Sequence, residues 1–597
     1  MNIAWVAVIS VIILALAYRF YGRLVAHWLG EDHSCPTPAV LFKDGKDFVP
    51  TRPSVLFGHH FASIAGAGPI LGPTLAACYG YGPVWMWVIL GGILFGAVHD
   101  YCALSVSMRE NGRSIAEVAR RTLGKPGFLL IVLFTSLMLI LVNAAFLQAT
   151  AMSLTSEYPI EALGIPAGQT LLATRVVDGV VKARIGGIAS TSVIIITALS
   201  PLVGFLLYRK NLPTLPAYLL TGAIAVGSIV AGFYLPVSIA PEYWMVLLTV
   251  YVLVASAIPV WVVLQPRDFT NVQILYAGIA LLLVGILAAG FVGGHFERPA
   301  ISAEQLQEGN AAAGSVWPML FVTVACGAIS GFHSLVAGGT TAKQCWLVKH
   351  SRPIAFGGML LESLLAAVVL ATVVWAWTAS PNLGFDKYRD LVWPAAGSGA
   401  KSNPILGFAV ACGMLFQKGL GIPVALGSVF GILMVEGFVV TTLDTAVRLN
   451  RYLFEELWLT LLGTKTPGFM KWIWFNSLLA VVLMFLMSYF NAFEKIWHVF
   501  GAGNQLLAAM GLLVVSMWLL GRKRQAWFAI LPAAFMTVTT LGALGWLFFT
   551  KYLPERNYTL MIADVVLVFL AVAMIVMSIH AFATKRYAKS EAGAQPI

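Results

Sequence analysis

The stretch that decides the fold is residues 58–73, which read GHHFASIAGAGPILGP. Its last eight residues contain three glycines and two prolines, namely Gly66, Gly68, Pro69, Gly72 and Pro73. Proline removes a backbone donor and glycine lowers helix propensity, so a regular helix cannot continue through them. The surrounding apolar run, 57–79, is long enough to cross a membrane. The stretch predicts a membrane helix broken near its middle, and the alternative is a small-residue face for close helix packing.

The composition of the whole chain points to the same solvent. Hydrophobic residues make up 59% of the 597 residues and charged residues 11%, whereas a soluble domain has about 25% charged residues. We therefore predict an all-α polytopic membrane protein. The net charge of +11 is typical of cytoplasmic loops rich in Lys and Arg and does not indicate nucleic-acid binding.

Apolar runs long enough to cross a membrane give fifteen candidate spans. They lie near 3–18, 57–79, 84–106, 128–151, 189–208, 216–234, 243–264, 272–293, 316–338, 353–378, 421–442, 472–490, 501–520, 526–550 and 561–583. With the N-terminus outside and the C-terminus in the cytoplasm, 26 of the 37 basic residues fall on the cytoplasmic side. One further apolar segment, 404–418, cannot cross in this scheme, so we expect it to be re-entrant or interfacial.

Two groups of basic residues mark the cytoplasmic side most firmly. They are the loop with Arg522, Lys523 and Arg524, and the tail with Lys585 and Arg586. No GxxxxGK[ST] motif occurs, so the sequence gives no sign of ATP hydrolysis on this chain. This absence favours a secondary transporter or a channel over a primary pump.

A second break is indicated in the seventh span by Pro259, within ASAIPVW at 255–261. The second and seventh spans run in opposite directions, and five spans separate their starts. This spacing predicts a five-plus-five inverted repeat, with spans two to six against those from seven onward, plus extra helices. The alternative for the seventh span is a lone proline kink. We divide the chain into an N-terminal helix and loop (1–56), an inverted-repeat core (57–442) and C-terminal helices with a short tail (443–597).

A broken helix exposes backbone groups that can bind a ligand. We expect Pro69 to begin a new half-helix capped by Gly68, with the N–H groups of Ile70, Leu71 and Gly72 free to bind an anion. The predicted substrate-binding residues lie in the second, seventh and ninth spans: Gly66, Ala67, Gly68, Ile70, Ser256, Ile258, Trp261, Ser330 and His333. Hydroxyls of the ninth span either bind a sodium ion together with carbonyls of the second span or bond back to their own helix.

Ionisable residues inside a membrane are costly, so each is a functional candidate. Four of them lie in the second and third spans and form the predicted proton-coupling group: His59, His60, His99 and Asp100. The turn at 80–83 makes these spans a hairpin, which places His60 and Asp100 at similar depth. We therefore predict a His60–Asp100 pair that exchanges a proton, with a structural polar clamp as the alternative. Further candidates lie elsewhere in the chain: Glu362, Glu436 and Asp564.

These motifs and several later ones together resemble the carbon starvation protein A (CstA) transporters of bacteria. The matching stretches are 58–69, 96–100, 258–268, 330–334, 441–448 and 500–506, and the similarity covers most of the chain, about 1–520. The resemblance implies a fold distantly related to amino acid–polyamine–cation transporters and a location in the bacterial inner membrane. It also implies uptake of pyruvate by proton symport, or uptake of peptides during carbon starvation.

Polar residues of the two late motifs are interpreted as gate or packing elements. They are Thr441, Thr442, Asp444, Arg448, Asn504 and Gln505. Asp444 and Arg448 are four residues apart, so we expect an intrahelical pair worth a few tenths of a kcal/mol if it is exposed. Arg267 is expected near the cytoplasmic end of a span.

The preferred function is proton-coupled import of a small organic anion, with pyruvate favoured. A di- or tripeptide importer of the same fold is the alternative, with Glu362 or Glu436 as counter-charge for the amino end. A membrane nutrient sensor is the alternative of another class. We expect no enzyme activity, because no nucleophile–base set is apparent. We also expect no metal site or disulfide, because the six cysteines lack the necessary spacing. The expected partners are a small-molecule substrate and the lipid bilayer, with a proton or a sodium ion as the coupling ion and no other cofactor.

Overall fold

The computed structural model describes residues 1–44, 48–161, 163, 172–177, 179–379, 384–395 and 400–584. In this part of the chain, thirteen helices are long and apolar enough to cross a membrane. One further pair of helices, Pro53–Ile64 and Gly68–Tyr79, is bent by 41° at a short break. The prediction of an all-α polytopic membrane protein is confirmed, and so is the break within 58–73.

The elements follow the chain in a fixed order. The helices are α1 (Ile3–Leu16), α2 (Gly22–Leu29), α3 (Pro38–Leu41), α4 (Pro53–Ile64), α5 (Gly68–Ala76), α6 (Tyr81–Gly91), α7 (Ala97–Arg109), α8 (Ile115–Thr155), α9 (Gly186–Gly204), α10 (Thr214–Tyr234), α11 (Pro241–Ala257), α12 (Leu264–Phe291), α13 (Ala303–Ala313), α14 (Phe321–Val324), α15 (Phe332–Gly339), α16 (Gly357–Ala379), α17 (Gly384–Val392), α18 (Pro404–Leu420), α19 (Val424–Leu462), α20 (Ile473–Phe490), α21 (Phe493–Gly521), α22 (Trp527–Leu547) and α23 (Tyr558–Thr584). Short 3₁₀ and π turns extend or join them: η1 (Ala17–Tyr21), η2 (Ala77–Tyr79), η3 (Gly92–Gly96), η4 (Phe205–Arg209), η5 (Val316–Leu320), η6 (Ala325–Gly327), η7 (Thr341–Lys343), η8 (Val348–His350), η9 (Arg352–Phe356), η10 (Gly463–Lys465), η11 (Gly468–Lys471) and η12 (Phe548–Tyr552).

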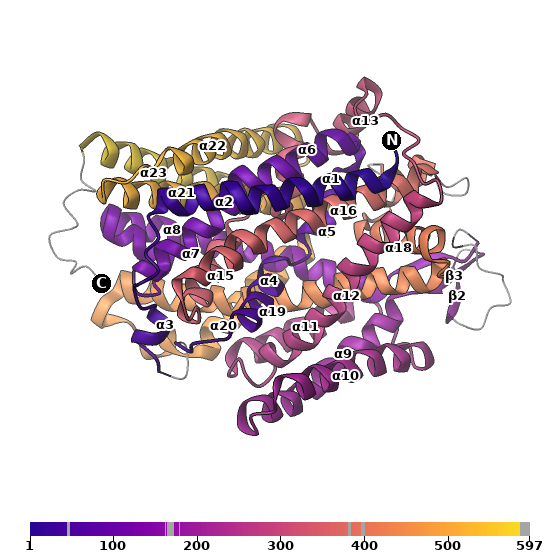
Figure 1. The fold of residues 1–597 in the computed structure, drawn as a ribbon, viewed down its shortest axis with the longest axis horizontal. Coiled ribbons are helices and arrows are strands. Elements are labelled where there is room, and N and C mark those ends of the chain that lie inside the picture. The colour runs from indigo at the N-terminus through magenta and orange to yellow at the C-terminus, as the bar shows by residue number, and fades with distance from the viewer. Residues whose placement is uncertain are drawn as a thin grey trace.

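The helix bundle has two ends, which we call outer and inner after the predicted orientation (Figure 1). At the outer end the N–H of Phe296 donates to the carbonyl of Met1 (3.0 Å). At the inner end Arg109 donates to the carbonyl of Gly30 (2.8 Å), and Arg522 lies 2.9 Å from Glu110. In Figure 1 the N-terminus, α13, β2 and β3 lie at the right and α3 at the left.

These contacts group the loops as the basic residues predicted. The inner end joins segments 19–56, 107–127, 339–352 and 521–525 through printed hydrogen bonds and ion pairs. The relative sides of these loops are therefore confirmed, and the identity of the cytoplasmic side stays a prediction. The tail with Lys585 and Arg586 lies outside the described residues.

The predicted loop 152–188 contains a small sheet that the sequence analysis missed. Its strands are β1 (Glu157–Pro159), β2 (Thr174–Val177) and β3 (Val180–Arg184), in the antiparallel order β1-β3-β2. Val176 pairs with Val181. β-branched residues favour an extended backbone, and Gly179 has a φ of +77° in the connecting turn.

The apolar segment predicted to be re-entrant or interfacial is α18. Its contacts agree with a re-entrant helix at the outer end. The carbonyl of Gly407, near its start, accepts a hydrogen bond from Trp377 at the outer end of α16 (2.9 Å). Near its end, Gly419 lies against Gly285 and Ala289, close to the outer end of α12. The helix therefore begins and ends near the same face.

The second broken helix is not the one that the sequence indicated. Residues 316–343 are interrupted between α14 and α15, where Ala325 has a φ of +47°. This break packs directly on α5, because Gly68 abuts Cys326 and Gly72 abuts the carbonyl of Val324. No proline marks the break, which explains why it was overlooked.

The predicted break at Pro259 is instead the turn between α11 and α12. Arg448 of α19 donates to the carbonyls of Ala255 (2.7 Å) and Ile258, and Arg451 donates to Ser256 (2.9 Å). The prediction that this turn faces the break in the second span is therefore wrong. The five-plus-five repeat stays a prediction, and the contacts favour 316–343 over 243–264 as the counterpart of α4 and α5.

The predicted orientation can be tested with two matched substitutions in a cysteine-free background. Gln307 at the outer end and Gln525 at the inner end are both exposed. An impermeant thiol reagent added to intact cells should label Gln307→Cys and leave Gln525→Cys unlabelled until the membrane is permeabilised. Labelling of Gln525→Cys from outside would reverse the assignment of the two ends.

The contact between the two broken helices is also testable. A Cβ at Gly72 would lie 2.2 Å from the carbonyl oxygen of Val324, and this backbone atom cannot rotate away. Gly72→Ala should lower stability by ~1–3 kcal/mol through overpacking. Gly227→Ala on α10 is the control, because its Cβ meets nothing within 4 Å. Thermal unfolding of the purified variants in detergent measures both effects, and equal midpoints would contradict this packing.

Candidate functional site

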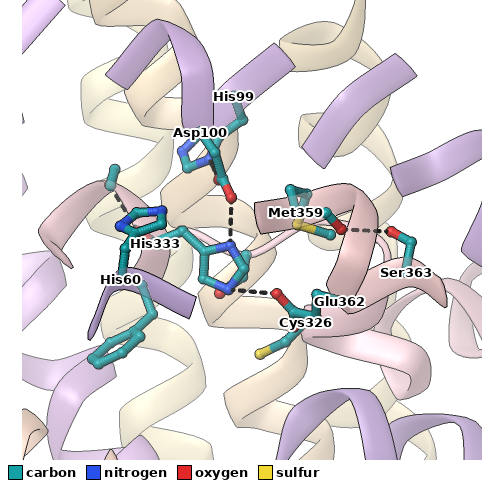
Figure 2. Close-up of polar contacts among 12 residues, drawn as sticks. His60, His99, Asp100, Cys326, His333, Met359, Glu362 and Ser363 are labelled. Carbon is teal, nitrogen blue, oxygen red and sulfur yellow. Dashed lines mark hydrogen bonds and ion pairs between the residues drawn. The ribbon is translucent and has the colours of Figure 1, made fainter. Parts of the chain in front are cut away.

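Four buried ionisable side chains form one continuous chain beside the second break (Figure 2). We call it the histidine–acid chain, and it consists of His99, Asp100, His333 and Glu362. His99 Nδ1 lies 2.8 Å from Asp100 Oδ1, and His333 Nδ1 lies 2.8 Å from Asp100 Oδ2. The other ring nitrogen of His333, Nε2, lies 3.4 Å from Glu362 Oε2. All four side chains are at most 1% exposed.

Three separate helices supply this chain. His99 and Asp100 lie in α7, Glu362 lies in α16, and His333 is the second residue of α15, which begins where the broken helix resumes. Each helix contacts the other two. The break therefore allows an imidazole to lie between two carboxylates that belong to different helices.

The arrangement can hold a variable number of protons. An imidazole between two carboxylates can donate from both ring nitrogens, and each carboxylate can accept or bind a proton. Among the described atoms, His99 Nε2 and both Glu362 oxygens make no hydrogen bond. An uncompensated charge in such a place is costly, so the total charge of the chain is under strong constraint.

The predicted His60–Asp100 pair is not formed. His60 Nδ1 lies 2.8 Å from the hydroxyl of Thr341, and the Nε2 atom of His60 has no described partner. Helix α15 contacts both α4 and α7, so His333 reaches Asp100 in place of His60. Depth along two helices was predicted correctly, but depth does not specify which faces meet. His59, the other predicted member, is partly exposed.

The break between α4 and α5 differs in detail from the prediction. Helix α5 begins at Gly68, and the N–H groups of Ile70 and Leu71 donate to the carbonyl of Ala67 at 3.1 and 2.8 Å. They are therefore not free, and the predicted anion site at Ile70–Gly72 is wrong. A helix that starts on a non-helical residue uses its preceding carbonyl in this way.

Free backbone donors do occur slightly earlier. The N–H groups of Gly66 and Ala67 make no hydrogen bond to another described residue. A Cβ on Gly66 would lie 2.7 Å from the hydroxyl oxygen of Thr442 in α19. That hydroxyl is buried and also lacks a described partner. The break thus presents two amide donors and a hydroxyl within one small region.

Asn504 and Gln505 of α21 satisfy the second break. The side-chain oxygen of Asn504 accepts from the N–H of Phe332 (2.9 Å), and its amide nitrogen donates to Ser330 (3.0 Å). Gln505 donates to the carbonyl of Phe321 (2.9 Å). The expected role of these amides as packing elements agrees with these bonds. The described bonds also engage Ser330, which leaves the ninth-span sodium site without support.

The predicted substrate-binding residues fall into two groups. Gly66, Ala67, Gly68, Ile70, Ser330 and His333 lie at or beside the two facing breaks. Ser256, Ile258 and Trp261 lie at the α11–α12 turn, where Ser256 bonds to Ser477 (3.0 Å) and Arg209 stacks on Trp261 (5.3 Å). The proposed role of each residue stays a prediction.

A second buried charge cluster was missed by the sequence analysis. Arg267 is fully buried, and its guanidinium lies 2.8 Å from Asp444 Oδ2 and 3.8 Å from Asp268 Oδ1. It also donates to the hydroxyls of Tyr251 and Thr441. Arg267 was placed at a helix end because Pro266 precedes it, but α12 begins at Leu264 and continues inward.

The predicted exposed pair of Asp444 and Arg448 is also wrong. Asp444 is fully buried against Arg267, and Arg448 caps carbonyls of the α11–α12 turn. A fixed spacing of four residues allowed the intrahelical pair, but each side chain found a stronger partner on another helix. An intramembrane charge should have been assigned a buried partner from the start.

Two broken helices that meet beside buried ionisable groups, within a large apolar bundle, define a secondary transporter of the membrane. Comparison with known proteins agrees with this class. The family model "Carbon starvation protein CstA" matches residues 2–383 and 390–543, so the chain belongs to the CstA family. The resemblance inferred from the motifs is thereby confirmed.

Three curated relatives show how far the similarity extends. The chain is 31% identical over 618 residues to "Peptide transporter CstA" of Bacillus subtilis (strain 168), which covers 98% of this chain and 97% of the relative. It is 31% identical over 601 residues to "Peptide transporter CstA" of Escherichia coli (strain K12), covering 91% and 81%. It is 29% identical over 625 residues to "Pyruvate/proton symporter BtsT" of the same strain, covering 91% and 81%.

Proposed function

We propose that this protein is a proton-coupled importer of a small carboxylate, with pyruvate as the first candidate. The observation that carries the proposal is His333, held between Asp100 and Glu362 at 2.8 and 3.4 Å beside the second break. The printed name of one relative, a pyruvate/proton symporter, supports the same substrate and coupling ion.

The substrate carboxylate would bind at the first break. The N–H groups of Gly66 and Ala67 are free of described partners, and the hydroxyl of Thr442 lies beside them. Amide and hydroxyl donors are suitable ligands for a carboxylate, particularly where water is excluded. Gly66 is suited to this position because a larger side chain would collide with Thr442.

Charge then couples the substrate to the proton. With His333 protonated and both Asp100 and Glu362 ionised, these three groups carry one net negative charge. A bound substrate anion adds a second negative charge to the same poorly solvated region. One additional proton on the histidine–acid chain offsets this charge, so substrate and proton bind more tightly together than apart.

A short peptide is the second candidate substrate. Two of the three relatives above are named peptide transporters. The buried side chain of Glu436 has a carboxylate oxygen without a described partner, and it could pair with a peptide amino terminus. A nutrient sensor, the alternative of another class, would bind such ligands without accumulating them.

Uptake into proteoliposomes tests the proposal and separates these candidates. Labelled pyruvate should accumulate when an inward proton gradient is imposed in sodium-free buffer. Asp100→Asn should abolish this accumulation, because an amide cannot exchange a proton, yet it should retain exchange of external for internal pyruvate. The control is Asp564→Asn, which removes another buried carboxylate, from α23, and should leave uptake unchanged.

Three outcomes would count against this account. Undiminished proton-driven accumulation by Asp100→Asn would remove the histidine–acid chain from coupling. Accumulation of a labelled dipeptide but not pyruvate would favour the second substrate. Binding of pyruvate without any accumulation would favour the sensor.

A further inference from the structure

A small internal cavity lies between α4, α12 and α19, apart from the histidine–acid chain. Its volume is about 10 Å³, which is roughly the space of one water-sized sphere. Five of its lining residues bear on the argument: Ala62, Asp268, Asn271, Gly437 and Thr441. Apolar side chains complete the wall.

One wall of this cavity carries an unpaired acid. Asp268 is 6% exposed, and its Oδ1 atom makes no described hydrogen bond. The nearest cation is Arg267, whose Nη2 atom lies 3.8 Å from that oxygen. A buried carboxylate oxygen without a hydrogen bond is costly unless a cation or a proton compensates it.

Arg267 does not supply that compensation in full. Its guanidinium lies 2.8 Å from Asp444 and also donates to Tyr251 and Thr441. Glu436, which is 2% exposed, also interacts with it electrostatically. Three carboxylates therefore share a single guanidinium, and the cluster has an excess of negative charge when all three are ionised.

The remaining lining groups are oxygen ligands. The amide nitrogen of Asn271 donates to the carbonyl of Gly437 (3.3 Å), which leaves its amide oxygen available. The hydroxyl of Thr441 donates its proton to the same carbonyl (2.8 Å), so its oxygen can act only as an acceptor.

Helix α4 adds a further negative end. Ala62 lies in its last turn, where carbonyl groups lack an intrahelical donor and the helix dipole is negative. The cavity is therefore bordered by a carboxylate, two neutral oxygens and a helix C-terminus, all of which attract a cation.

We propose that this cavity is a binding site for a monovalent cation, with sodium as the natural occupant. Oxygen ligands select hard cations and not the metals that prefer nitrogen or sulfur. Calcium requires six to eight oxygen ligands and magnesium a near-octahedral set, which exceeds what about one water-sized space can hold. A bound ion would connect α4 to α12 and α19 at the inner side of the first break.

Purified protein in detergent provides the test. Sodium chloride should raise the unfolding temperature relative to choline chloride at equal ionic strength, and radioactive sodium should bind with a stoichiometry of one per chain. Asp268→Asn should weaken sodium binding at least tenfold. Thr441→Val, which keeps the volume and removes the hydroxyl, is the second variant if Asp268→Asn does not fold.

Asp564→Asn is the matched control, because it also removes a buried carboxylate but lies on α23, and it should keep the sodium response. The proposal is overturned if the parent protein shows no sodium-specific shift or if both site variants retain it. In that case Asp268 is compensated by its own proton. Proton-driven pyruvate uptake in sodium-free buffer is a separate readout, so either proposal can fail without the other.

Discussion

The rest of the structure depends on one constraint: in a membrane interior, every backbone N–H and C=O group needs a partner within the protein. A broken helix violates this rule locally, and the two breaks are stable because other groups replace the missing bonds. Asn504 and Gln505 bond to the backbone of Phe332 and Phe321 at the second break. Gly72 allows α5 to approach the carbonyl of Val324 closely.

The same constraint determines where chemistry can occur. Where the backbone at Gly66 and Ala67 is left unpaired, a ligand can supply the missing acceptor. Where α15 resumes after the second break, His333 meets Asp100 and Glu362 from two other helices. A substrate site and a proton site thus arise from one structural feature, namely two breaks that face each other (Figure 2).

Several features could be predicted from the sequence because they are local. The composition required a membrane fold, and the prolines at 69 and 73 located the first break. The pairings could not be predicted, because spacing along a helix gives depth but not the direction of a side chain. His60 and Asp100 lie at similar predicted depth, yet α15 contacts both their helices and His333 takes the position beside Asp100. The second break escaped notice because it contains no proline, and Arg267 because a proline next to it resembled a helix end.

The central claim is that the histidine–acid chain gains a proton when substrate binds. The most direct measurement is the pH change of a weakly buffered solution of purified protein on addition of pyruvate, followed with an indicator dye near neutral pH. The account predicts uptake of about one proton for each pyruvate bound, and no uptake by Asp100→Asn under the same conditions. Saturating pyruvate that binds without any proton uptake by the parent protein would contradict it.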